Sequence, residues 1–140
     1  MKAVTYTISN DMKALASTID LMINNIISER FMSDQILFEI KVVLNELIVN
    51  ALFYGNNCEL GKATYVTLKL VSNKYLYISV KDEGYGFKPK FNTCSLDDYV
   101  EVINNSLCEH GRGLLIVDRL CNRVKFNKSG NRVSILKYIQ

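Results

Sequence analysis

The chain has 140 residues, 49% of them hydrophobic and 22% charged, and its formal net charge is +3. This length and composition predict a single folded domain, residues 1–140, and exclude an intrinsically disordered chain. The net charge is too small to indicate a nucleic-acid or membrane partner, because the lysines and arginines after Arg112 alternate with apolar residues, as on a solvated strand.

The cysteine pattern indicates reduced thiols. Cys58, Cys94, Cys108 and Cys121 form no C-x-x-C pair, and His110 is the only histidine, so zinc-site spacing is absent. A redox-sensitive Cys94–Cys108 pair is a less favoured alternative. The sequence shows no signal peptide and no apolar run able to span a bilayer, so we expect a cytoplasmic protein without a membrane partner.

The first two predicted elements are a strand and a helix. Residues 3–8 alternate between apolar and other side chains, which predicts a short strand. Asn10 or Asp11 can cap the helix that follows. Its apolar residues recur every three or four positions, and it is expected to end near residues 28–31.

The central helix is predicted to begin at residues 33–34, to run to about Tyr54 and to stop at Gly55. Its apolar residues cover nearly the whole circumference, so we expect it to be buried. Glu46, Asn50 and Tyr54 recur at four-residue intervals and should share one stripe. A carboxylate and an amide in apolar surroundings need partners, which are either a metal-bound anionic ligand or backbone groups and water.

Two further strands are predicted at residues 63–71 and 75–81. Asp82 has the parity of the inward-facing residues of the second strand, so its carboxylate should point between sheet and helices. Gly84 and Gly86 follow, and glycines allow close approach of a ligand. Asp82 is therefore a candidate acceptor for an exocyclic amine such as that of adenine, although a plain strand-to-loop turn is the alternative.

Residues 85–110 lack clear periodicity and contain the only proline, so we interpret them as a long functional lid with a short helix at residues 97–104. A helix at residues 111–121, stopped by Asn122 in the left-handed conformation, and a hairpin follow. The element order predicts an α/β (α+β) two-layer sandwich, with helices on one face of a mixed, mostly antiparallel sheet.

The start of the helix at residues 111–121 suits an anion. Gly111 and Gly113 leave backbone N–H groups free at a positive helix end, and Arg112 can add a charge-assisted contact or point into solvent. The spacing is neither a Walker loop nor a dinucleotide-binding fingerprint.

The combination and order of these segments resemble the GHKL ATPase superfamily with its Bergerat ATP-binding fold, and within it the small bacterial anti-sigma-factor serine kinases. Residues 45–51 resemble the N box, residues 82–86 the first glycine box and residues 111–114 the second. Residues 133–135 resemble the final-strand pattern in which a Ser or Thr, here Ser134, helps to hold adenine.

This resemblance implies ATP and Mg²⁺ as ligands, with Asn50 binding the metal, Glu46 acting as the general base and Asp82 pairing with the adenine amine. It also implies a wider set of nucleotide-binding residues. These are Tyr54, Gly84, Gly86, Gly111, Arg112, Gly113, Leu114 and Ser134. Tyr54 departs from the histidine that these kinases commonly carry, and the lid, with Cys94, Cys108 and His110, matches no family pattern.

Three functional hypotheses follow. The leading one is an ATP-dependent protein serine/threonine kinase that binds a sigma factor and phosphorylates an anti-sigma-factor antagonist. The alternative is a non-catalytic module of the same fold whose lid reports ATP or ADP to a partner, as Tyr54 and the lid suggest. A purely structural domain is the third and requires Glu46, Asn50 and Asp82 to be satisfied internally. The resemblance also implies a homodimer through the sheet side, and no direct contact with nucleic acid is expected.

Overall fold

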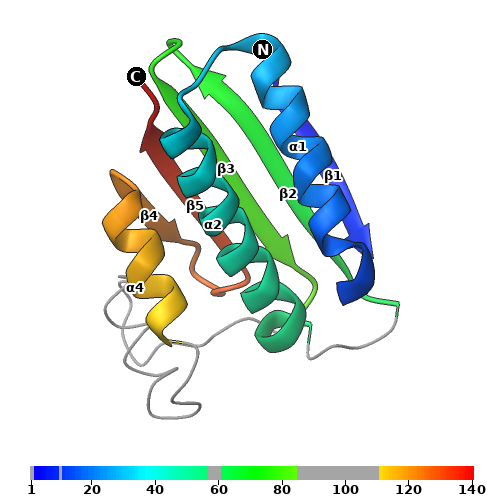
Figure 1. The fold of residues 1–140 in the computed structure, drawn as a ribbon. Coiled ribbons are helices and arrows are strands. Elements are labelled where there is room, and N and C mark those ends of the chain that lie inside the picture. Colours follow the sequence, from blue (N-terminus) through cyan, green and yellow to red (C-terminus); the bar gives the residue numbers. More distant parts are fainter. Residues whose placement is uncertain (1, 10, 57–60, 85–110) are drawn as a thin grey trace.

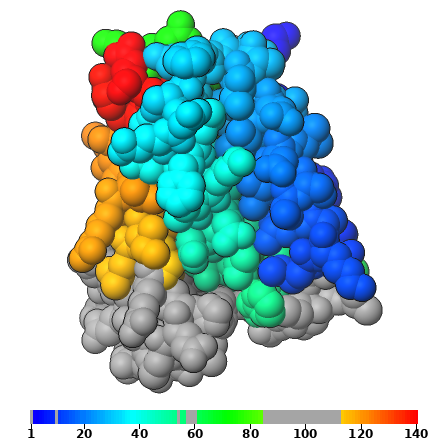
Figure 2. Space-filling model, viewed as in Figure 1, coloured from blue at the N-terminus to red at the C-terminus, as the bar shows by residue number. Residues whose placement is uncertain are grey.

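The computed structural model describes residues 2–9, 11–56, 61–84 and 111–140. Over these residues the domain has two layers, with three α-helices on one face of a five-stranded sheet (Figure 1). Figure 2, viewed from the helical side, shows side chains of these helices covering that face. The predicted lid and its helix at residues 97–104 lie outside the described residues, as do Gly86, Cys58, Cys94, Cys108 and His110.

The sheet has the strand order β1-β2-β3-β5-β4, and every described pair is antiparallel. The strands are β1 (Val4–Ser9), β2 (Ala63–Val71), β3 (Tyr75–Asp82), β4 (Arg123–Phe126) and β5 (Arg132–Tyr138). The predicted two-layer α+β sandwich is thus confirmed. The β2–β3 turn uses left-handed Ser72 and Asn73, both with φ of 55°.

The helical layer begins with a short 3₁₀ turn, η1 (Met12–Ala14), capped by Asp11, whose side chain accepts a hydrogen bond from the Lys13 amide. The layer continues with α1 (Leu15–Glu29), α2 (Asp34–Asn50), the π-helical turn η2 (Ala51–Gly55) and α4 (Gly111–Leu120). Ser33 caps α2 by accepting a hydrogen bond from the Ile36 amide. Ser33 therefore caps α2 as predicted, whereas Asp11 caps the 3₁₀ turn that leads into α1, and the N-cap of α1 itself, Ala14, makes no side-chain hydrogen bond.

Two expectations about the helices are wrong. The α2 helix is only partly buried, because its outer side faces solvent in a two-layer domain: Phe38 is 67% exposed and Asn45 is exposed. Asn122 does not adopt a left-handed conformation after α4. Its amide donates to the Leu136 carbonyl, and its side-chain oxygen accepts from the Tyr138 amide at 2.7 Å, which ties the helix end to β5.

The core lies between the layers, and its largest fully buried side chains come from the helical layer and from the three middle strands β2, β3 and β5. They are Met22, Ile26, Ile40, Leu44, Leu47, Ile48, Leu52, Leu68, Leu76, Ile78, Leu114 and Ile135. No helix within the described residues is long and apolar enough to cross a membrane.

Lys137 is an unexpected member of this interior, since it points inward from β5 and is only 3% exposed. Its Nζ lies 3.0 Å from Glu39 Oε2 on α2 and donates to the Leu120 carbonyl at the end of α4 at 2.7 Å. A buried ammonium needs such partners, so this side chain connects β5 to two helices. Nearby, burial is the main cause that raises the pKa of the Cys121 thiol to about 12.

Candidate functional site

Several of the predicted site residues lie at the lower end of the domain in Figure 1, where β3 and α2 end, α4 begins and the β4–β5 turn lies. A small cavity of about 20 Å³ is found there. Asn50 and Asp82 supply polar walls, and Val80, Leu114 and Val133 supply apolar ones. The helix stripe and the strand end that the sequence singled out thus meet at one place.

Asp82 is the last inward-facing residue of β3 and is 8% exposed. Its Oδ1 accepts a hydrogen bond from the Gly84 amide at 2.9 Å, and its own amide donates to the Asn131 carbonyl. Burial raises the pKa of this carboxyl, although the Gly84 hydrogen bond and the charge of Lys62 oppose the shift. A desolvated carboxylate held in this way is well suited to accept a hydrogen bond from a ligand.

Gly55 and Gly84 are required by close packing around this carboxylate. A Cβ on Gly55 would lie 2.1 Å from Asp82 Cγ and Oδ2, and one on Gly84 would lie 1.8 Å from the Gly55 carbonyl oxygen. Neither residue has a left-handed φ. The helical segment ends at Gly55, as predicted, but Gly55 is not a left-handed stop: the absence of a Cβ allows η2 to pass against Asp82. Gly84 likewise contacts protein backbone, where the sequence suggested approach of a ligand.

Glu46 and Asn50 lie on one face of α2, as predicted. Asn50 is 7% exposed, and its Nδ2 has no hydrogen-bond partner in the described part of the chain. Leaving a buried amide unpaired costs about 1–3 kcal/mol, and a ligand can remove that cost. Glu46 is half-buried, and its carboxylate lies against Gly113, where an added Cβ would be 2.1 Å from Oε2. The stripe thus faces the start of α4.

The stripe does not continue regularly beyond Asn50. From Ala51 to Gly55 the helix has π geometry, so the four-residue spacing that placed Tyr54 on the stripe assumes an α-helix where there is none. The side chains of Tyr54 and Arg112 lie outside the described part of the chain. Gly111 is the first residue of α4, and Leu114 is buried against the cavity.

Ser134 lies on the opposite face of the sheet. Its neighbours Val133 and Ile135 are buried on the helix side, whereas Ser134 pairs with Ser79 and its Oγ is 3.2 Å from the Tyr77 hydroxyl. Strand alternation sends it away from the cavity. The expectation that Ser134 contacts adenine is corrected accordingly, since on β5 it is Val133 that lines the cavity.

Sequence reasoning missed Asn56, a fully buried residue that positions the site. Its Nδ2 donates to the Ala63 carbonyl and to Thr64 Oγ1, and its Oδ1 accepts from the Glu83 amide at 2.8 Å. The side chain thereby fixes the end of η2 to both β2 and β3. An Asn after a helix-ending glycine looks like an ordinary turn residue, so the sequence gives little signal. The β4–β5 turn residues Gly130 and Asn131, which also line the cavity, were missed for the same reason.

The sequence pattern of the family described as histidine kinase-like ATPase domain matches residues 8–137. The chain belongs to this family. The antiparallel sheet with helices on one face is consistent with the Bergerat fold of histidine kinase-like (GHKL) ATPases. A comparison with curated proteins finds no match. Membership of the histidine kinase-like ATPases implies ATP binding, with Mg²⁺ typical of the family.

The described residues of this histidine kinase-like domain fit that ligand. Asn50, whose Nδ2 has no partner among the described residues, and Asp82, a desolvated acceptor, line one cavity together with Leu114 of α4. Because the side-chain amide of Asn50 can rotate by about 180°, either its oxygen or its nitrogen can face the cavity. A volume of about 20 Å³ holds roughly one water molecule, so a nucleotide can enter only if the surrounding elements move apart.

Proposed function

We propose that the domain is an ATP-dependent protein serine/threonine kinase of the anti-sigma-factor type, which binds a sigma factor and phosphorylates an antagonist protein on serine. The observation that carries the proposal is that Asn50 on α2 and Asp82 on β3 line one cavity, while Glu46, one helical turn before Asn50, lies against Gly113 near the start of α4. The acid suits a general base, the amide suits a metal ligand, and the buried acceptor suits a group that recognises adenine.

Each residue has a distinct task in this proposal. Asp82 accepts the hydrogen bond of the adenine amine, and Asn50 supplies an oxygen for Mg²⁺, which when bound neutralises phosphate charge. Glu46 accepts the proton of the attacking serine hydroxyl as the serine oxygen bonds to the γ-phosphorus, while the bond from that phosphorus to the β–γ bridging oxygen breaks and ADP leaves. The amides at the start of α4, beside Glu46, stabilise phosphate oxygens through the helix dipole.

Phosphate transfer tests the kinase directly. The protein is incubated with Mg²⁺, [γ-³²P]ATP and a candidate antagonist, and label on serine is measured. We expect Glu46→Gln to lower transfer by about 10²-fold or more, since general-base catalysis contributes 10²–10⁴-fold. Glu29→Gln, which removes an exposed carboxylate at the end of α1, is the matched control. Absence of transfer by the wild type, or equal transfer by Glu46→Gln, refutes the proposal.

A second candidate is a nucleotide-gated binding module without phosphotransfer. The narrow cavity favours it, because ATP entry must be coupled to a rearrangement that a partner can sense. Thermal shifts with ATP, ADP and GTP, with and without Mg²⁺, test binding separately from turnover. Ligand at about one hundred times its dissociation constant adds about 2.7 kcal/mol to the free energy of unfolding. Stabilisation by ATP without label transfer to any partner would favour the module over the kinase.

A further inference from the structure

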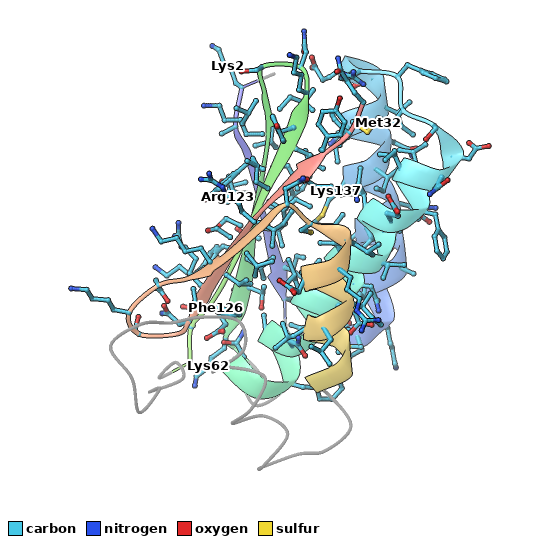
Figure 3. All side chains as sticks on the ribbon, turned by 90° about the vertical axis from the view of Figure 1, so that its left-hand side faces the viewer. Lys2, Met32, Lys62, Arg123, Phe126 and Lys137 are labelled. Atoms are coloured by element: carbon cyan, nitrogen blue, oxygen red, sulfur yellow. The ribbon has the colours of Figure 1, made fainter. Side chains whose placement is uncertain are left out.

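Every charged side chain on the face of the sheet that points away from the helices is positive. Strand alternation and register place five cationic side chains there. They are Lys69, Lys81, Arg123, Lys125 and Arg132. No described outward strand position holds an acid, since Asp82, the only acidic strand residue, points inward. In Figure 3 the helices lie to the right of the sheet, and Arg123 is among the side chains on its left.

This bias is not expected from the composition, because the chain has 17 basic and 14 acidic residues. Lys81 and Arg132 are direct cross-strand partners, and like charges in that arrangement destabilise a sheet. Within the described residues no carboxylate forms an ion pair with any of the five. Glu83, which follows Asp82 just beyond β3, accepts a hydrogen bond from the Ala63 amide. An anionic partner would therefore relieve repulsion that the fold leaves in place.

Tyrosines are interleaved with these cations. In one row across the strands, Tyr65 is the direct partner of Lys81. In a second row, Tyr77 lies between Lys69 and Leu136, and Leu136 in turn pairs with Arg123. Between these two rows lies a row of small hydroxyl side chains, Thr67, Ser79 and Ser134. The Cβ atoms of directly opposite residues on neighbouring strands are about 5 Å apart, so each of these rings and its cationic partner leave the sheet side by side. Each strand alone merely alternates, so this surface is formed only by the register of the sheet.

We propose that this outer sheet face binds single-stranded nucleic acid, with phosphates on the lysines and arginines and bases on the tyrosine rings. Aromatic rings among cations on an antiparallel sheet are the means by which proteins bind single strands without base pairing. Three of the five cations are lysines, which are depleted in protein–protein interfaces, so an acidic protein fits less well. A second copy of the chain would place five cations against five, which disfavours the sheet-to-sheet homodimer implied by the resemblance.

The test is fluorescence anisotropy with the full chain and labelled 20-nucleotide RNA and DNA of mixed sequence, at salt concentrations from 50 to 500 mM. Neutralising Z phosphates of a single strand lowers log K by about 0.7Z per log unit of salt. For four or five contacts we expect a slope of about −3 in the wild type. Lys69→Gln, Lys81→Gln and Lys125→Gln combined should make the slope shallower by about 2.

The matched control removes three exposed cations from the helical layer, as Lys13→Gln, Lys41→Gln and Arg119→Gln combined, and should leave the slope unchanged. Tyr65→Thr should weaken binding about fivefold or more without changing the slope, because stacking contributes about 1–3 kcal/mol per base. Binding of either strand type supports the proposal, and the tighter one identifies the natural class.

Absence of binding at 50 mM salt overturns the proposal, as does equal weakening by the control triple variant. Polyglutamate that binds as tightly as the oligonucleotides also overturns it, in favour of an acidic polypeptide. The site lies on the face opposite the cavity, so its failure leaves the proposed kinase unaffected.

Discussion

Asn56→Ala tests whether the buried amide between η2 and the strands positions the site. The substitution removes three hydrogen bonds, to the Ala63 carbonyl, Thr64 Oγ1 and the Glu83 amide, from a fully buried side chain. At about 1 kcal/mol for each bond, the free energy of unfolding should fall by about 3 kcal/mol. The main-chain bond from the Asn56 amide to the Ala51 carbonyl is retained, so the helix end itself persists.

Urea denaturation measures this change, and a loss of about 3 kcal/mol corresponds to a fall in Tm of roughly 10 °C for a chain of this size. Asn25→Ala is the matched control, because this exposed residue makes one side-chain hydrogen bond, to the Tyr6 hydroxyl, and should lose less than about 1 kcal/mol. ATP affinity should fall in Asn56→Ala alone, since Gly55 and Asp82 lose their fixed relation. Equal losses in both variants would refute this reasoning.

Four other substitutions test the same region and the buried lysine. Burial raises the pKa of Asp82, so the folded state keeps the carboxyl proton as pH rises above the ordinary carboxyl range, and the free energy of unfolding of the wild type falls across that window. Urea titrations from about pH 3 to about pH 7 should show a smaller fall in Asp82→Asn, which should also bind ATP more weakly. Gly55→Ala should destabilise by about 1–3 kcal/mol in a thermal melt, because its Cβ would overlap the Asp82 carboxylate, and an unchanged Tm would contradict the packing. Lys137→Met should lower the free energy of unfolding by about 1–3 kcal/mol, which is less than the loss on breaking a fully buried ion pair, because Glu39 is 21% exposed. Adding Glu39→Gln should restore part of this loss, and a double variant no more stable than Lys137→Met would contradict a role for the pair.

Much of the fold was predictable because local patterns and the final structure agree. The period-two pattern of β3 placed Asp82 inward, and the caps at Asp11 and Ser33 were visible as side chains that prefer helix starts. These features depend on residues close in sequence. The all-antiparallel order, by contrast, depends on β5 inserting between β3 and β4, which no local pattern reveals.

The candidate site was predictable only in part. The stripe of Glu46 and Asn50 follows from helix geometry, but the π turn that interrupts it before Tyr54 has no clear sequence signal. The role of Gly55 depends on its contact with a side chain 27 positions away (82 − 55) and could not be inferred from its position at a helix end. Ser134 was misplaced because a resemblance in a strand pattern outweighed the parity of its neighbours.

The ends of β3 and β5 serve both sides of the sheet through alternate residues. Asp82 and Val133 line the cavity, while their chain neighbours Lys81 and Arg132 form a cross-strand pair on the outer face. The peptide backbone joins each of these neighbours, so a twist of the strand ends would displace groups on both faces. If the proposed ligand of one face twists these strand ends, it will change the affinity of the other face, and linkage requires the second ligand to change the affinity of the first by the same factor.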